Sequence, residues 1–204
     1  MKAGHQLLGW AAAALLAARA VAGGGTEADV RPLVLDPEHS SIEVQVHATF
    51  DSFLGHLSKF ETDIRIDPVH ARTQRAVVTF AFADLKTGRP GRDRDMQAWS
   101  ETNQYPTVEF HMESLEQTPG APTLAHGSLK IHGIEHATTF PVSFLIEGPL
   151  YAIDGEVALD YRDFGLPVIR KFVILTVDPR LVVRFHLQGR LAAAAAAAPG
   201  AAMP

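Results

Sequence analysis

Residues 41–47 read Ser-Ile-Glu-Val-Gln-Val-His, and residues 59–66 read Lys-Phe-Glu-Thr-Asp-Ile-Arg-Ile. In both stretches apolar and polar residues alternate, which places the apolar side chains on one face of a β-strand and the polar ones on the other. About eight segments with this pattern lie near 38–48, 56–67, 75–83, 107–116, 124–132, 138–147, 155–162 and 181–191. Eight one-sided antiparallel strands can close a barrel around side chains or one small ligand. The sequence therefore predicts an all-β, eight-stranded antiparallel barrel.

The longest break in this pattern is the connection at residues 84–106. Glycine and proline interrupt the strands there, and residues 93–99 can form one or two helical turns. Met96 and Trp99 are three residues apart and so share one face of such a turn. We expect a short helix over one barrel opening, with these two side chains facing inward.

The two ends of the chain differ in composition from the predicted barrel at residues 33–191. Residues 1–22 have the pattern of a secretory signal peptide, with Lys2, an apolar stretch at 7–18 and a small-residue cleavage site before Gly23. A retained membrane anchor is the alternative, but the apolar stretch is shorter than the ~20 residues that a span needs. We expect an exported protein. We expect the remaining end segments to be a flexible leader at 23–32 and a disordered tail at 192–204, which is rich in alanine and proline.

Composition excludes several classes of function. The chain has 204 residues and a formal net charge of −5, and loss of Lys2 and Arg19 with the signal peptide makes the remainder more acidic. An acidic protein is a poor ligand for nucleic acid. No cysteine is present, so a thiol nucleophile, a disulfide and a lipid anchor on cysteine are all excluded.

The ten histidines raise the possibility of a metal site or an enzyme. His126 and His132 are six residues apart on one predicted strand, which separates them by about 20 Å. His132 and His136 flank a turn at Gly133 and supply two ligands at best, whereas zinc sites take three or four from the protein. No Gly-x-Ser-x-Gly or metal-protease signature occurs. We expect no catalytic residues, no metal and no cofactor.

The loop at residues 86–94 carries four cations on an otherwise acidic chain. Its glycines let backbone N–H groups approach an anion, and a following helix would add its positive end. One hypothesis is a site for a phosphate or carboxylate head group that includes Arg89 and Arg92. The alternative is a solvated loop in which Arg92 pairs with Asp93 or Asp95.

A series of short motifs occurs in order along the chain. They are LDPEHSSI at 35–42 running on to His47, Gly55 and Asp67, Thr87-Gly88 with Arg92-Asp93, YPTVEF at 105–110, GSLKIHGI at 127–134, and DFGL at 163–166. With these motifs the chain resembles the YceI-like family of bacterial periplasmic lipid-binding proteins over roughly residues 33–191. The resemblance implies a lipocalin-like barrel in the periplasm that holds a long isoprenoid or fatty chain in its lumen, for carriage or storage.

A period-two apolar face is ordinarily explained by a packed core. The resemblance to the family favours a ligand cavity instead. The tail-binding residues predicted on this basis are Ile42, Val44, Val46, Phe60, Ile64, Val78, Phe80, Phe82, Trp99, Phe110, Met112, Phe140 and Phe144. His39 and His47 match the family pattern, and we assign them to local hydrogen bonds or, together with Arg89 and Arg92, to the head group. The chain departs from the family at Tyr161, where an arginine is usual; Arg162 follows on the opposite side of the strand.

Three hypotheses about function remain open at this point. The first is a binding protein for a polyisoprenoid or another long-chain lipid, the second a histidine-based metal-binding or hydrolytic protein, and the third a stress protein whose barrel is filled. A transient donor or acceptor at the inner membrane and a homodimer are partners that the sequence permits.

Overall fold

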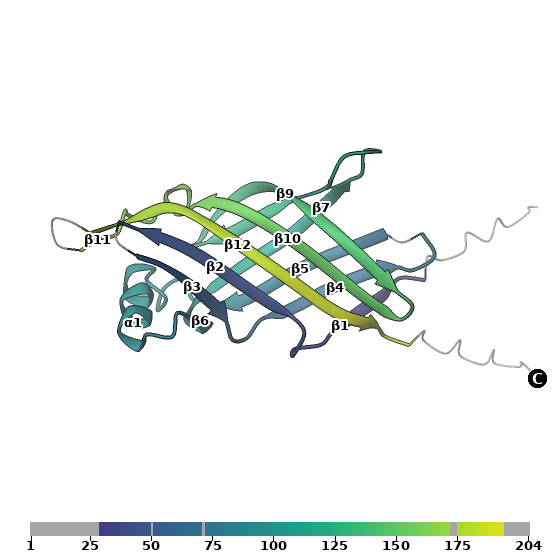
Figure 1. Cartoon of the computed structure of the whole chain (residues 1–204), viewed down its shortest axis with the longest axis horizontal. Coiled ribbons are helices and arrows are strands. Elements are labelled where there is room, and N and C mark those ends of the chain that lie inside the picture. The colour runs from purple at the N-terminus through teal and green to yellow at the C-terminus, as the bar shows by residue number, and fades with distance from the viewer. Residues whose placement is uncertain (1–28, 50, 71, 172–174, 194–204) are drawn as a thin grey trace, which may run out of the picture.

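The computed structural model describes residues 29–193 except 50, 71 and 172–174. Most of them belong to strands that wrap around one axis, with a single α-helix beside one end (Figure 1). The strands are β1 (Arg31–Leu35), β2 (Ser41–Ala48), β3 (Asp51–Leu57), β4 (Glu61–Asp67), β5 (Arg72–Ala81), β6 (Leu85–Lys86), β7 (Thr107–Glu116), β8 (Thr123–Ile131), β9 (Ile134–Glu147), β10 (Leu150–Asp160), β11 (Arg170–Lys171) and β12 (Leu175–Leu191). The helices are the 3₁₀ turns η1 (Phe82–Asp84) and η2 (Tyr161–Phe164) and the α-helix α1 (Pro90–Trp99).

The strands form a closed antiparallel barrel with eight wall positions, as the sequence predicts. At three of the eight positions around the barrel, two short strands lie end to end and together take the place of one long strand. These pairs are β1 with β2, β3 with β4, and β5 with β6. Neighbours in the chain pair around the barrel, and β12 closes it by pairing with both β1 and β2. All pairings are antiparallel, so one face of each strand points into the barrel.

The last strand is longer than the predicted segment 181–191. Alternation in the sequence stops at Pro179, which has no backbone N–H for a strand ladder. In the structure β12 nevertheless begins at Leu175, because the pairing register with β2 shifts between Val177 and Leu181. Such an irregularity accommodates a proline within a strand.

The predicted helix is present and longer than expected. It starts at Pro90 rather than at residue 93, and proline suits the first helical position because the N–H group there has no partner within the helix. α1 contacts β6 and η1 and lies at one end of the barrel (Figure 1). Among the residues that the structure describes, no helix has the length and apolar character needed to cross a membrane.

A cluster of buried aliphatic side chains extends along the barrel wall from β1 to the region of α1, since it includes Leu85 of β6 and since Met96 of α1 packs against it. Leu33 of β1, Ile66 of β4 and Leu187 of β12 belong to this cluster, and Tyr151 of β10 packs against it. Leu33, Ile66 and Tyr151 are not part of the cavity wall described below. The part of the cluster around β1 therefore lies outside the cavity wall, whereas Leu187 and Leu85 of the same cluster line the cavity.

Candidate functional site

The interior of the barrel is a large apolar cavity rather than a filled core. Its volume is about 1130 Å³, above the ~300–1,000 Å³ that is typical of small-molecule sites. Twelve of the thirteen side chains predicted to bind a tail line it. They are Ile42, Val44, Val46, Ile64, Val78, Phe80, Phe82, Trp99, Phe110, Met112, Phe140 and Phe144.

Three other residues predicted to contact a ligand lie away from the cavity wall. Phe60 falls in the break between β3 and β4 and packs against the aliphatic cluster, because period-two alternation does not continue through a break in the strand. His39 is exposed in the turn between β1 and β2, where Nδ1 lies 2.9 Å from Oδ2 of Asp36. His47 contacts Oγ of Ser52 at 2.8 Å. Both histidines make the local hydrogen bonds that were one of their two predicted roles.

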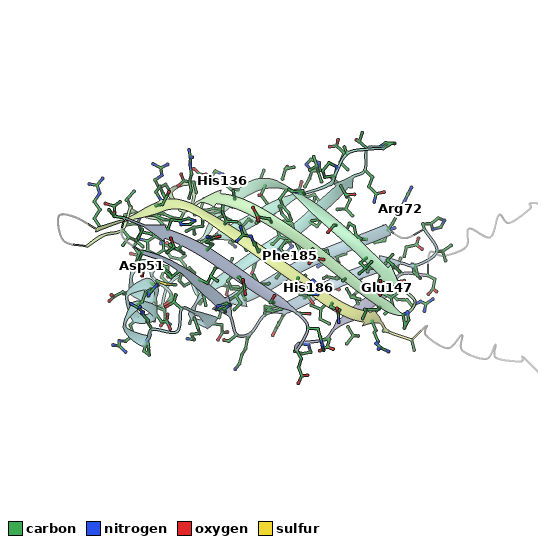
Figure 2. All side chains as sticks on the ribbon, viewed as in Figure 1. Asp51, Arg72, His136, Glu147, Phe185 and His186 are labelled. Carbon is green, nitrogen blue, oxygen red and sulfur yellow. The ribbon has the colours of Figure 1, made fainter. Side chains whose placement is uncertain are left out.

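Part of the cavity wall comes from residues that the sequence analysis did not name. Ile153, Val157 and Leu159 of β10 line the cavity. So do Leu181, Val183, Phe185 and Leu187 of β12, with Phe185 midway along the strand (Figure 2). The signal for them was present, because apolar residues occupy alternate positions in both segments.

At one end of the cavity, the wall is formed by α1 and by the segment after η2. Trp99 of α1 packs edge-on against Tyr161, with ring centroids 5.1 Å apart, and its Nε1 donates to the carbonyl of Pro167 at 2.9 Å. Leu166, Val168 and Ile169 complete this side of the wall. We refer to this end as the mouth.

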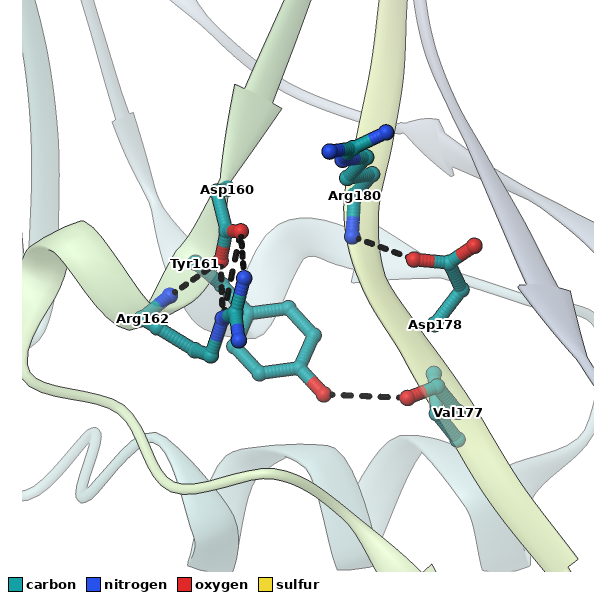
Figure 3. Close-up of polar contacts among 6 residues, drawn as sticks. All are labelled: Asp160, Tyr161, Arg162, Val177, Asp178 and Arg180. Atoms are coloured by element: carbon teal, nitrogen blue, oxygen red, sulfur yellow. Dashed lines mark hydrogen bonds and ion pairs between the residues drawn. The ribbon is translucent and has the colours of Figure 1, made fainter.

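Tyr161 occupies the position where the family usually has an arginine, and its environment is apolar. It is 2% exposed, and its hydroxyl donates to the carbonyl of Val177 at 3.2 Å (Figure 3). Burial raises the pKa of this phenol, so it remains a donor at neutral pH. Arg162 does not line the cavity. It forms an ion pair with Asp160, with Nη2 2.5 Å from Oδ2 (Figure 3). The wall therefore has a phenol at this position, although Arg170, which follows Ile169, also lines the cavity.

A different arginine reaches the cavity from α1. Cζ of Arg92 lies 3.8 Å from the ring centroid of Phe53, and both residues line the cavity, as does Arg89. The Nη1 atom of Arg92 is buried, and no hydrogen-bond partner for it exists among the described residues. The sequence analysis offered Asp93 or Asp95 as a partner for Arg92. Among the described residues no ion pair joins Arg92 to Asp93, whose Oδ1 accepts from N and Oγ1 of Thr87 at 3.0 and 2.6 Å. A pair between Arg92 and Asp95 stays a prediction.

Asp93 is one of the few buried charged residues and stabilises the turn before α1. Burial alone would raise its pKa, but the two hydrogen bonds from Thr87 together with the positive charges of Lys86 and Arg92 outweigh burial and hold the pKa of Asp93 below its usual value. The carboxylate of Asp93 thus binds the loop before α1 through Thr87. Arg92 stacks on Phe53 and lines the cavity.

The histidines that lie near acidic residues form pairs on the outside of the barrel. His186 lies 2.6 Å from Asp154, and His56 lies 3.2 Å from Glu43. His132 contacts Glu101 at 3.1 Å. Within the described part of the chain, no group of three or more His, Asp or Glu side chains is arranged to hold a metal ion.

Metal removal is expected to leave the fold unchanged, because these pairs offer too few ligands for a structural site. Dialysis against EDTA should not alter the melting temperature, which differential scanning calorimetry measures. A lowered melting temperature after dialysis, or stoichiometric zinc by elemental analysis beforehand, would favour the metal-binding hypothesis.

The fold and the site define a class of protein: a closed antiparallel barrel with an apolar lumen that opens beneath a short helix. Residues 33–188 match the model of the YceI-like domain, and the chain belongs to this family. No match is found among curated proteins.

Solved structures share the fold at low sequence identity. BcnA of Burkholderia cenocepacia is 20% identical with a TM-score of 0.68, and the match covers 76% of this chain and 99% of BcnA. A polyisoprenoid-binding domain from Saccharophagus degradans, implicated in plant cell wall breakdown, is 15% identical with a TM-score of 0.61, over 81% of this chain and all of that domain. The YceI protein of Campylobacter jejuni is 16% identical with a TM-score of 0.58, over 67% and 83%.

Proposed function

We propose that this protein binds a polyisoprenoid or another long-chain amphiphilic lipid non-covalently, with the tail in the barrel lumen. The observation that carries the proposal is the apolar cavity of about 1130 Å³. Membership of the YceI-like family and the fold shared with a polyisoprenoid-binding domain support it. At ~0.8 kcal/mol per buried CH₂, a dozen methylenes contribute roughly 10 kcal/mol, against an association cost of about 4–15 kcal/mol. Only long tails should therefore bind usefully.

The test is native mass spectrometry of protein purified from its own source, followed by organic extraction. A lipid adduct that disappears on extraction and is recovered in the organic phase is the expected result. Protein that carries no adduct, and that takes up no long-chain alcohol when one is supplied, would exclude this function.

We assign the polar head of the lipid to the mouth, next to Arg92 and Arg89. Nη1 of Arg92 is a buried donor with no hydrogen-bond partner in the part of the chain that the structure describes, and leaving such a group unsatisfied costs about 1–3 kcal/mol. A phosphate or carboxylate oxygen at this point would accept its hydrogen bond. Because the tail supplies most of the binding free energy, the arginine should select among head groups more than it sets affinity.

Replacing Arg92 with alanine is expected to reduce the preference for an anionic head while retaining tail binding. The ratio of the Kd values for hexadecan-1-ol and hexadecyl phosphate should fall about tenfold, which corresponds to ~1.4 kcal/mol for one charged hydrogen bond. Isothermal titration calorimetry measures both constants. Arg94→Ala is the matched control, since Arg94 is exposed on the same helix and does not line the cavity. An unchanged ratio in Arg92→Ala would exclude the arginine from the head-group site.

We further propose that the protein is exported and acts in the periplasm, where it carries or stores its lipid. The predicted signal peptide lies outside the described residues, so the support is its sequence pattern. The mature chain is expected to begin at Gly23 or within two or three residues of it. N-terminal sequencing of the periplasmic fraction measures this. A chain that begins at Met1 in the membrane fraction would contradict a soluble carrier.

A further inference from the structure

The wall of the barrel is interrupted at the end remote from α1, where the hairpin of β7 and β8 turns away from β5 (Figure 1). β5 pairs with β7 only over residues 77–81. Within the described part of the chain, residues 72–76 of β5 and 112–116 of β7 therefore have no strand partner on the sides that face each other. β8 pairs with β9 only as far as Val142, so residues 143–147 of β9 extend past it. We call the space between these three unpaired stretches the gap.

Two β-bulges lie at the edges of the gap, one on each of the strands that separate. Gln74 is an extra residue in β5, where the register with β4 shifts between Arg65 and Ile66. Glu113 is an extra residue in β7, where the register with β8 shifts in the same way. A bulge bends its strand and increases the local twist. With one bulge on each side, β5 and β7 diverge instead of continuing their ladder to the end of the barrel.

The cavity extends to the gap, at the end of the barrel that Arg72 and Glu147 mark in Figure 2. Five side chains from the unpaired stretches line the cavity. They are Thr73 and Ala76 of β5, Met112 and Leu115 of β7, and Phe144 of β9. None of the five is buried, and Phe144 is 36% exposed. Ile146 is the next residue on this face of β9; it lies beyond the cavity wall and is 47% exposed. A mostly apolar path therefore leads from the lumen to the surface.

We propose that the gap is a second opening of the lumen, through which the end of a tail longer than the lumen leaves the barrel. The inference rests on the proposed function, that the lumen holds a lipid tail whose head lies at the mouth. Lumen length then sets no upper limit on the length of the tail. Carbons beyond the gap lie against the exposed apolar side chains of Phe144 and Ile146.

The length of the lumen shows which tails should reach the gap. The lining positions on β5 run from Phe80, near the mouth, to Thr73, about 18 Å along the axis of a barrel whose strands tilt by ~40°. Carbon–carbon bonds of about 1.5 Å let an extended chain advance by ~1.3 Å per carbon, so a tail of roughly 14–16 carbons reaches the gap. Hexadecan-1-ol therefore ends close to it, and tetracosan-1-ol extends through it.

The test is the variant Thr73→Trp, in which a large ring on the lumen face of β5 fills the gap. Wild-type and variant proteins receive an equimolar mixture of hexadecan-1-ol and tetracosan-1-ol from cyclodextrin, and native mass spectrometry measures the bound ratio. Wild type should bind both alcohols. In Thr73→Trp the ratio of tetracosan-1-ol to hexadecan-1-ol should fall at least about tenfold, because the excess carbons would have to fold back into a packed lumen. Gln74→Trp is the matched control, since Gln74 is exposed and does not line the cavity. Its ratio should stay within about threefold of wild type.

A second measurement uses the absence of cysteine from the chain. The thiol of the Thr73→Cys variant should react with a charged methanethiosulfonate reagent, and bound tetracosan-1-ol should slow this reaction because the tail covers the thiol. The thiol of Gln74→Cys, on the outer side of the same strand, should react at the same rate with and without the alcohol.

Three results would overturn the inference. The first is wild-type protein that binds hexadecan-1-ol but not tetracosan-1-ol, which leaves the proposed function intact. The second is a folded Thr73→Trp variant with an unchanged ratio. If that variant does not fold, the third applies, a Thr73→Cys thiol that tetracosan-1-ol does not protect. Wild-type protein that binds neither alcohol would instead contradict the proposed function.

Discussion

Replacing Phe80 with arginine is expected to abolish lipid co-purification while leaving a folded barrel. Phe80 lies on β5, pairs with the buried Val108 and lines the cavity. A long arginine side chain can extend along the open lumen toward water at the mouth, so the free energy of unfolding should fall by only about 1–3 kcal/mol. A lipid tail beside this charge would have to desolvate it without a partner. Urea denaturation and native mass spectrometry measure the two effects.

Thr79→Arg is the matched control for this variant. Thr79 is the preceding residue on β5, faces outward and lies in register with Glu61 and Glu109. An arginine there is flanked by carboxylates, so stability should change by less than ~0.5 kcal/mol and lipid content should not change. If Phe80→Arg folded and still carried the wild-type amount of lipid, the tail would not occupy the lumen at this strand.

The barrel was predictable from sequence because antiparallel strands with one buried face leave a strict period of two. In residues 41–47 and in residues 76–80 of β5 every second residue is apolar, and those residues do face the lumen. The pattern failed where the backbone departs from a regular strand. Phe60 continues the alternation of Ile64 and Ile66 but lies between β3 and β4. Pro179 interrupts the alternation, so the sequence did not indicate that β12 begins at Leu175.

The mouth was less predictable, because it depends on contacts between distant segments. The loop at 86–94 indicated a cationic site, but periodicity could not show that Arg92 lines the cavity, stacks on Phe53 and has a buried Nη1 atom. Nor could it show that Asp93 is bound by Thr87 instead of by Arg92. The departure at Tyr161 was visible in the sequence. Its consequence, an aromatic contact with Trp99, required the fold.

That contact makes Tyr161 the residue of the mouth whose truncation should affect stability most. Tyr161→Ala removes a ring that is 2% exposed and packs against Trp99. Loss of a buried aromatic ring costs about 3–5 kcal/mol, and because one side of Tyr161 already borders the cavity, we expect a value near 3 kcal/mol. For a barrel of this size the melting temperature should fall by roughly 6–12 °C. Differential scanning calorimetry measures the shift.

Tyr161→Phe separates the ring from its hydroxyl, since the hydroxyl donates to Val177 and accepts from the backbone N–H of Ile169 at 3.3 Å. Keeping the ring and losing these bonds should cost about 1 kcal/mol, the usual value for a neutral hydrogen bond. If Tyr161→Ala were no less stable than Tyr161→Phe, ring packing would not stabilise the mouth. A larger loss of stability in Tyr161→Ala than in Tyr161→Phe would show that apolar packing of the ring holds α1 against η2 at the mouth. An arginine at this position would have supplied a charge instead.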